Sequence, residues 1–288
     1  MIEALGAVQE VSHSEQSAVG LCAGGITLSL AASHLQQTGE QDRLAGITLA
    51  VCVLDNERAG TTSAFVDRTV AQLAVAESAR RGYLDGRALA GVFAWLRPND
   101  LIWNYWVNNY LLGKEPPAFD VLYWNSDTTN LPAALHRDFV EISLENSLVK
   151  PDSTEALGTP VDLSKVTIDS YVVAGISDHI APWESCYAST QLLGSEPRFV
   201  LSTSGHIAAM VNPPGNEKAS YQTGDGNPPS PEAWLEAAAK KRGTWWVDWL
   251  EWLGERSGPQ RPARRRLGAS GYKPLVDAPG TYVLQSTG

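Results

Sequence analysis

The chain has 288 residues and a formal net charge of −10, with 43% hydrophobic and 19% charged residues. This composition is typical of a folded globular protein, and the acidic charge argues against nucleic acid as a partner. No run approaches the roughly 18 apolar residues that span a bilayer, and we find no signal-peptide pattern, so we expect no transmembrane segment. Three scattered cysteines suit neither a disulfide framework nor a metal site, which favours a reducing cytoplasm.

Three apolar runs are predicted to be strands of a parallel sheet. Residues 44–54, 168–175 and 198–202 are nearly continuous apolar segments, as is typical of strands that are buried on both faces. Helical patterns occur beside them, for example at 66–80 and 183–193. This alternation predicts the α/β class, with a mostly parallel sheet and helices on both faces.

Between the first two strands the pattern changes, and we expect a helical cap insertion over 56–165 that lies above the C-terminal edge of the sheet. Its segment 103–136 is dense in Trp, Tyr and Asn. The simplest interpretation is that these aromatic residues form the core of the cap, and the alternative is that some of them line a substrate path. The expected division of the chain is 1–55 and 166–256 for the core, 56–165 for the cap and 257–288 for an irregular tail.

The segment after the last predicted strand is expected to form two helices over 230–258. Trp245, Trp249 and Trp252 recur there at helical spacing on one face. Such a stripe indicates core packing more often than a binding surface.

The segment GLCAG at 20–24 matches the G-x-nucleophile-x-G pattern, with cysteine at the position of the nucleophile. This pattern forms a sharp turn from strand to helix, in which the nucleophile has a strained backbone. We expect Gly20 and Gly24 to be required because strand and helix pass too close for a Cβ atom, and Gly25 to add room. A buried cysteine at a tight turn is the alternative interpretation of Cys22.

The helix that follows begins directly after the cysteine. Its N-terminus should therefore favour the thiolate of Cys22 over the thiol. The backbone N–H of Ala23 is placed to donate a hydrogen bond to an oxyanion.

A cysteine nucleophile of this kind needs a base, and the base needs a carboxylate to orient it. In α/β-hydrolases the acid and then the histidine follow the nucleophile along the chain. Asp178 follows the strand 168–175 and His206 follows the strand 198–202, both at strand C-terminal ends where such sites are built. His179 follows the wrong strand to be the base, and we expect at most a supporting role for it.

The remaining histidines and cysteines are expected to be structural. His13 precedes the strand of the elbow, His34 lies on the helix after it, and His136 lies in the insertion. Cys52 and Cys186 are expected to be packed interior residues.

Longer segments extend the pattern around these residues. They are GLCAGG at 20–25, WNYWVNNYL, FDVLYWNSDTTNLP, SDHIAPW, SGHIAAMVNPP, WWVDWLEWL and APGTYV. On these segments the chain resembles the catalytic part of a polyhydroxyalkanoate synthase over essentially its whole length. The resemblance implies an α/β-hydrolase fold and polymerisation of (R)-3-hydroxyacyl-CoA, with Cys22 as the acylated nucleophile, His206 as the base and Asp178 as its acid partner.

The resemblance also implies partners and a location. CoA thioester would be the substrate with no bound cofactor, and the partners would be the growing polyester chain and a second copy or a synthase N-terminal half. The expected location is the cytoplasm, at the surface of polyester granules. Because about four strands precede the nucleophile in this fold and only 21 residues precede Cys22, we expect the first strands and the upstream oxyanion donor to be missing, and the chain alone to aggregate and lack polymerase activity.

Two other functions remain open. A cysteine hydrolase of the dienelactone-hydrolase type has the same fold, although the long insertion rich in Trp and Asn argues against it. An inactive synthase fragment that only associates with granules or with a full-length partner would agree with the missing strands.

Overall fold

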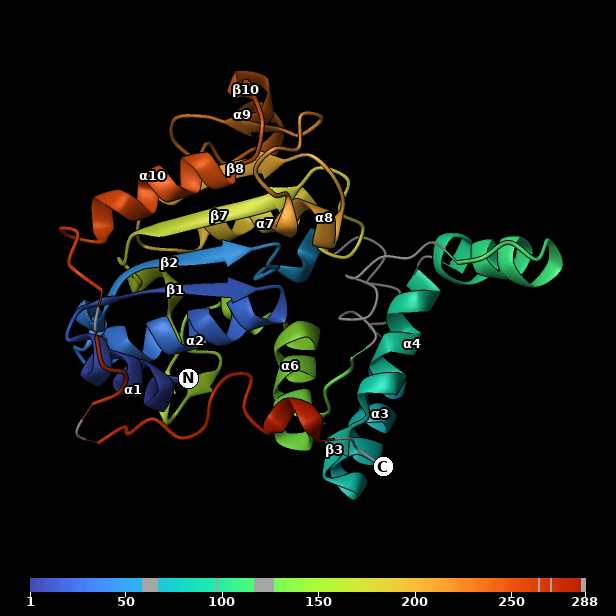
Figure 1. The fold of residues 1–288 in the computed structure, drawn as a ribbon, viewed down its shortest axis with the longest axis horizontal. Helices are drawn as coiled ribbons and strands as arrows, with labels where there is room; N and C mark the ends of the chain where they lie inside the picture. The colour runs from blue at the N-terminus through green and yellow to red at the C-terminus, as the bar shows by residue number, and fades with distance from the viewer. Residues whose placement is uncertain (59–66, 97, 117–126, 264, 270, 286–288) are drawn as a thin grey trace.

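The computed structural model describes residues 1–58, 67–96, 98–116, 127–263, 265–269 and 271–285. Within these residues the centre of the molecule is a six-stranded sheet with the order β1-β2-β7-β8-β9-β10 (Figure 1). The first four strands run parallel, whereas β9 is antiparallel to β8 and β10 is antiparallel to β9. The strands are β1 Gln16–Leu21, β2 Leu44–Ala50, β7 Ser170–Gly175, β8 Arg198–Ser202, β9 Ser220–Thr223 and β10 Ala239–Arg242.

Both faces of the central strands are covered, which explains their continuous apolar sequences. In β7, Tyr171 and Val173 belong to one hydrophobic cluster, while Val172 and Ala174 belong to the other. Successive side chains of a strand point to opposite faces, so one strand contributes to two cores. One face is covered by α2 Ala23–Gln37, α7 Trp183–Ala188 and α9 Pro231–Ala237, and the other by α10 Trp246–Arg256.

The three predicted strands are present, and the stripe of tryptophans packs as expected. Trp245 and Trp252 are buried against Tyr171, and Trp249 packs beside them. The two helices predicted over 230–258 are present as α9 and α10, but the structure adds two strands that were not predicted, because β10 lies between these helices and pairs with β9. All four side chains of β10 are exposed. Its sequence AKKR therefore lacks the alternation of apolar and polar residues from which a strand is predicted.

Strand β1 differs from the other parallel strands because it lies at the edge of the sheet within the described residues. Val19 pairs with Thr48, and Leu21 pairs with Ala50, so these two side chains share the face that α10 covers over β2. On β1 that face is open, with Val19 47% and Leu21 54% exposed. The edge strand therefore presents apolar side chains and unpaired backbone groups on its outer side.

Strands β2 and β7 pair directly, so the long segment between them is an insertion. Two helices of the insertion, α3 and α6, pack on each other, and the short strands β3 and β4 pair beside them. Near α2, β5 and β6 form a second short pair. The elements are α3 Arg68–Arg81, β3 Tyr83–Leu84, α4 Gly86–Leu96, the π-helical η4 Asn99–Trp103 and η5 Trp106–Leu111, β4 Leu131–Pro132, α6 Ala133–Glu145, β5 Glu155–Ala156 and β6 Thr159–Pro160.

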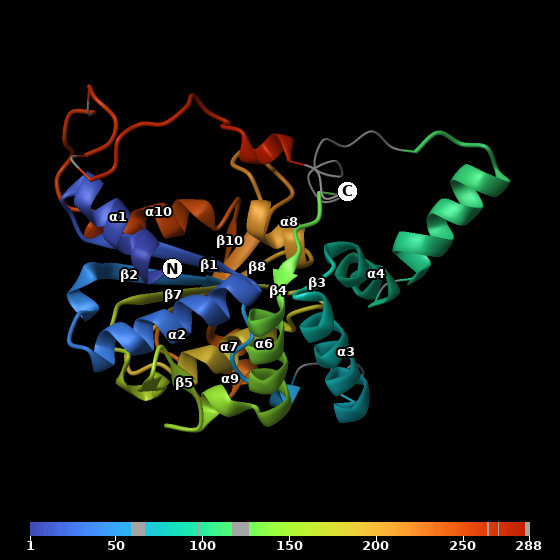
Figure 2. The ribbon, with the colours of Figure 1, turned by 90° about the horizontal axis from the view of Figure 1, so that it is seen from below.

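The middle of the insertion does not lie over the sheet, contrary to the expected cap. Figures 1 and 2 show α4, η4 and η5 projecting away from the sheet. Trp103, Trp106 and Tyr110 are exposed there, so the interpretation of these three as the core of a cap is wrong. The aromatic residues at 119–124 lie outside the described residues.

The first helix and the tail complete the fold. Helix α1 Ile2–Ser12 places Leu5 in the same core as α2. The tail from residue 257 is largely exposed and irregular, and it passes outside α1, with Gly271 close to Glu10 (Figure 2). Among the described helices, none has both the length and the apolar character needed to cross a membrane.

Candidate active site

Cys22 occupies the turn between β1 and α2. Its backbone has φ 51° and ψ −123°, a positive φ that costs a non-glycine residue about 1–3 kcal/mol. The Cys22 N–H donates to the carbonyl of Ala50 at 2.9 Å, and the Cys22 carbonyl accepts from the N–H of Gly25 at 2.9 Å. Ala23 is the first residue of α2, so its N–H has no partner within the helix and lies beside the half-buried thiol.

Two of the three glycines in this turn are required by close packing. A Cβ atom on Gly20 would lie 2.5 Å from the Cα of Gly25, and one on Gly25 would lie 2.7 Å from the Cβ of Cys52. A Cβ on Gly24 would meet nothing within 4 Å. The expectation that Gly24 is required is therefore wrong, because the close approach of strand and helix involves Gly20 and Gly25.

The structure brings together the side chains that the sequence predicted as a triad. Nδ1 of His206 donates to Oδ2 of Asp178 at 2.7 Å. Cys22 lies close enough to this imidazole for the charge of its sulfur to raise the pKa of His206. Asp178 is held by two backbone N–H groups, since its Oδ1 accepts from Ile180 at 2.9 Å and from Ala181 at 3.0 Å.

Burial and charge act in opposite directions on the histidine. Burial disfavours the imidazolium, but the hydrogen bond to Asp178 and the negative charges of Cys22 and Asp178 outweigh burial and raise the pKa of His206 to about 9. The other two cysteines are different, because burial raises the pKa of Cys52 and of Cys186 well above the ordinary range. Of the three cysteines, only Cys22 therefore combines access to solvent with a basic partner.

Comparison with known proteins decides the family. Residues 1–213 match the model of the alpha/beta hydrolase fold. The chain belongs to the α/β-hydrolase family. Poly(3-hydroxyalkanoate) polymerase 2 of Ectopseudomonas oleovorans is 50% identical to this α/β-hydrolase over 283 residues, which are 98% of this chain and 50% of that protein. Poly(3-hydroxyalkanoate) polymerase subunit PhaC of Cupriavidus necator is 40% identical over 289 residues, 98% of this chain and 49% of that protein.

The chain thus spans about half the length of the curated relatives it matches. The prediction of an α/β-hydrolase fold with a mainly parallel sheet is confirmed by the family match and by the strand order.

Two further strained residues lie at the same edge of this α/β-hydrolase sheet. Val51, directly after β2, has φ 47°, and Ser204, two residues before His206, has φ 88°. Both are fixed by backbone hydrogen bonds, from the Val51 N–H to Val173 at 2.8 Å and from the Ser177 N–H to Ser204 at 3.1 Å. Backbone strain often concentrates at functional sites. Sequence analysis missed both residues, because neither residue type indicates a positive φ.

The other candidates lie apart from the triad or make their own contacts. His34 bonds to Thr159 at 2.9 Å, His136 bonds to Ser78 at 2.8 Å, and His13 is the C-cap of α1. His179 is half-buried beside Asp178, and its supporting role remains a prediction. Among the described residues no three His, Cys, Asp or Glu side chains gather as a metal site would require.

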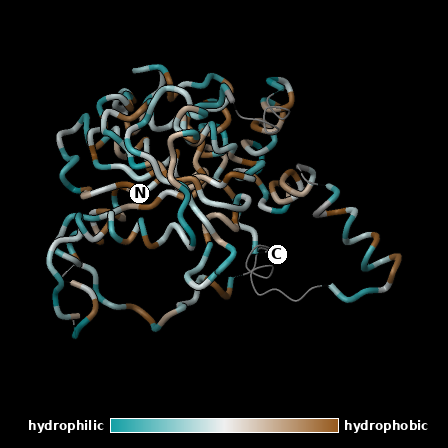
Figure 3. Tube along the Cα trace, turned by 90° about the horizontal axis from the view of Figure 1, so that it is seen from above, coloured by the Kyte–Doolittle hydropathy of each residue, from teal (hydrophilic) through white to brown (hydrophobic). Residues whose placement is uncertain are grey.

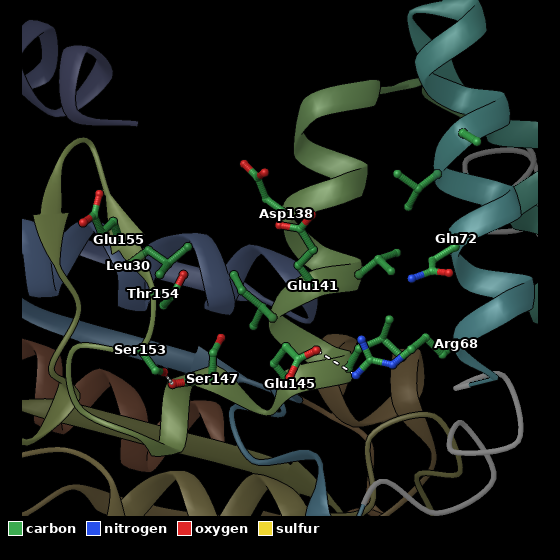
Figure 4. A pocket seen from close by; sticks show the side chains of 15 residues that line it. Leu30, Arg68, Gln72, Asp138, Glu141, Glu145, Ser147, Ser153, Thr154 and Glu155 are labelled. Atoms are coloured by element: carbon green, nitrogen blue, oxygen red, sulfur yellow. Dashed lines mark hydrogen bonds and ion pairs between the residues drawn. The ribbon is translucent and has the colours of Figure 1, made fainter.

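A cavity of about 700 Å³ lies between α3 and α6, and none of the three triad residues lines it (Figure 4). Figure 4 shows Arg68 paired with Glu145, at 2.7 Å. The lining carboxylates are those of Asp138, Glu141, Glu145 and Glu155. Four carboxylates against one guanidinium make this cavity unsuitable for an anionic ligand.

Proposed function

We propose that Cys22, His206 and Asp178 catalyse thioester acyl transfer, and that the chain supplies this site to a poly(3-hydroxyalkanoate) polymerase. The observation that carries the proposal is the 2.7 Å hydrogen bond between Asp178 and His206, with Cys22 beside that imidazole at a strained strand-to-helix turn. The names of relatives at 50% and 40% identity give the product, a poly(3-hydroxyalkanoate). The acyl donor that we propose for it is a (R)-3-hydroxyacyl thioester of CoA.

In the first step, the sulfur of Cys22 attacks the carbonyl carbon of the acyl-CoA. His206 holds the proton of the thiol, and the negative charge that develops on the carbonyl oxygen is stabilised by the N–H of Ala23 at the N-terminus of α2. When the C–S bond to CoA breaks, the leaving thiolate takes the proton from His206. CoA departs as a free thiol, and the acyl group stays on Cys22 as a thioester.

In the second step, the hydroxyl group of another hydroxyacyl unit attacks the thioester on Cys22. His206 accepts the hydroxyl proton, and Asp178 keeps the imidazole in the required tautomer through its bond to Nδ1. The Cys22–acyl bond breaks, an ester bond forms, and the cysteine leaves as a thiolate beside the imidazolium. No step needs a bound cofactor, since CoA serves only as a leaving group.

Mass spectrometry tests the nucleophile directly. The chain is incubated with 3-hydroxybutyryl-CoA, digested at acidic pH, and searched for acylated cysteine peptides. We expect the acyl group on Cys22 and expect the label to vanish in Cys22→Ala, in which Cys52 and Cys186 are still present. A label on either of those buried cysteines would overturn the assignment.

The products distinguish polymerase from hydrolase activity. Release of CoA together with oligomeric ester identifies polymerisation, whereas CoA with free 3-hydroxybutyrate identifies a cysteine hydrolase. The open edge of β1 favours a second candidate, an inactive part that needs another polypeptide. That candidate is supported if Cys22 reacts with iodoacetamide but takes up no acyl group until the N-terminal half of a relative is added.

A further inference from the structure

The projecting part of the insertion carries the three tryptophans that are exposed in the described part of the chain, Trp95, Trp103 and Trp106. We define the aromatic arm as α4, η4 and η5, and its apolar surface by Trp103, Trp106 and Tyr110, which are 48%, 49% and 72% exposed. Trp106 and Tyr110 stack with ring centroids 4.4 Å apart, and Trp103 precedes them at helical spacing. Figure 3 shows hydrophobic segments along this arm, away from the body of the molecule. Exposed apolar patches of this kind mark interaction sites.

The polar groups of the arm are mostly occupied with one another. The side-chain amide of Asn108 donates to Oδ1 of Asn104 at 2.7 Å, and that of Asn109 donates to the carbonyl of Lys114 at 2.8 Å. The indole N–H groups of Trp103 and Trp106, by contrast, form no hydrogen bond within the described part of the chain. The arm thus offers flat apolar rings together with unused N–H donors.

Charge limits the kind of partner that fits. From Gly86 to Leu111 the sequence contains only two positive residues and one negative residue, Arg87, Arg97 and Asp100, in a chain of net charge −10. Helices that bind anionic membranes carry many Lys and Arg residues on their polar face, which this segment lacks. The surface suits an uncharged apolar material that presents hydrogen-bond acceptors.

The position of the arm relates it to the triad. The insertion leaves the sheet at the C-terminal end of β2, and Cys22, Asp178 and His206 follow the C-terminal ends of β1, β7 and β8. In Figure 1 the arm extends on the side towards which the arrows of β1 and β2 point. A product that grows from Cys22 therefore emerges at the edge from which the arm projects.

We infer that the aromatic arm binds the polyester product, an uncharged aliphatic chain whose ester carbonyls accept hydrogen bonds and whose backbone has no donors. This inference rests on the proposed function, because that function names the product. The aliphatic stretches cover the rings of Trp103, Trp106 and Tyr110, and the carbonyls accept from the two indole N–H groups. The arm thereby keeps the protein at the surface of the polymer while the triad extends it.

Co-sedimentation with protein-free nanoparticles of amorphous poly(3-hydroxybutyrate) tests the inference with the 288-residue chain. We expect the triple variant Trp103→Gln, Trp106→Gln, Tyr110→Gln to bind at least about tenfold more weakly. The matched control is Val247→Gln, Leu250→Gln on α10, which removes side chains that are 54% and 57% exposed, and should bind like the parent chain. Cys22→Ala should also bind normally, because binding to the finished polymer needs no acylation.

Three results would overturn the inference. The first is equal binding by the parent chain and the arm variant. The second is equally strong binding of the parent chain to phosphatidylserine vesicles, which would indicate a membrane surface. The third is loss of self-association by the arm variant in sedimentation velocity with unchanged binding to particles, which would indicate a second copy as the partner. If the parent chain binds the particles but does not acylate Cys22, the role of the arm is supported and the proposed catalysis by the isolated chain is not.

Discussion

The side chains at the C-terminal edge of the sheet are buried and fixed by hydrogen bonds, whereas those of the aromatic arm are exposed. At the edge, the side chain of Asp178 is fully buried and that of His206 is 10% exposed, and hydrogen bonds of 2.7–3.0 Å fix both groups. In the arm, the large rings are about half exposed or more, and their stacking partner is another residue of the arm. Acyl transfer requires groups positioned to within about 0.5 Å, whereas binding of a disordered polymer requires accessible surface.

Removal of the base His206 should have the largest effect on the acyl-transfer activity of the site at the C-terminal edge. His206→Gln should lower acylation of Cys22 and ester formation by about 10³-fold or more, because no group remains to hold the thiol proton. Asp178→Asn should slow ester formation more than the first acylation, since the N-terminus of α2 still assists the thiolate. Single-turnover CoA release and multiple-turnover polymer formation measure the two steps. Equal loss of both steps in the two variants would show that Asp178 and His206 do not divide the work in this way.

The glycines of the elbow provide a matched pair that tests how rigid the edge must be. Gly20→Ala should destabilise the chain by about 1–3 kcal/mol or more, because its methyl group meets the backbone of Gly25, which cannot rotate away. Gly24→Ala should change the free energy of unfolding by less than about 1 kcal/mol, in the stabilising direction, because its methyl group has open space. Urea unfolding of both variants measures the difference. A costly Gly24→Ala would contradict the packing described for this turn.

Gly20 and Gly24 also show which features of the site can be predicted from the sequence and which cannot. The spacing of Cys22, Asp178 and His206 after apolar runs predicted their meeting, because parallel strands place their C-terminal ends at one edge. The glycine pattern predicted the turn but not which glycine is crowded, since that depends on the three-dimensional approach of α2 to β1. The strain at Val51 and Ser204 had no sequence signal at all. Exposure of Trp103 and Trp106 was missed because a dense aromatic segment ordinarily indicates a core.

The protonation of His206 predicts how stability depends on pH. Its pKa is raised from 6.5 to about 9 in the folded chain, so its stabilising contribution is complete below pH 6.5 and is lost as pH rises through about 9. That contribution is at most roughly 3 kcal/mol. The difference in free energy of unfolding between the parent chain and His206→Gln should therefore shrink between pH 6.5 and 9.5, as measured by urea titration. Val247→Gln, which removes an exposed side chain and no titratable group, is the control and should leave the pH dependence of stability unaltered.

The smallest effect on the free energy of unfolding is expected for substitutions in the arm. Trp103→Gln and Trp106→Gln should each change the free energy of unfolding by less than about 0.5 kcal/mol, because neither ring contributes to the two hydrophobic clusters of the sheet. Trp234→Ala, by contrast, should cost about 3–5 kcal/mol, since Trp234 is 1% exposed and packs against Phe199 and Tyr187. Thermal and urea unfolding of the three variants measure both effects. A large loss of stability from either arm substitution would mean that the rings are covered within the folded chain, and they would then be unavailable to bind a polymer surface.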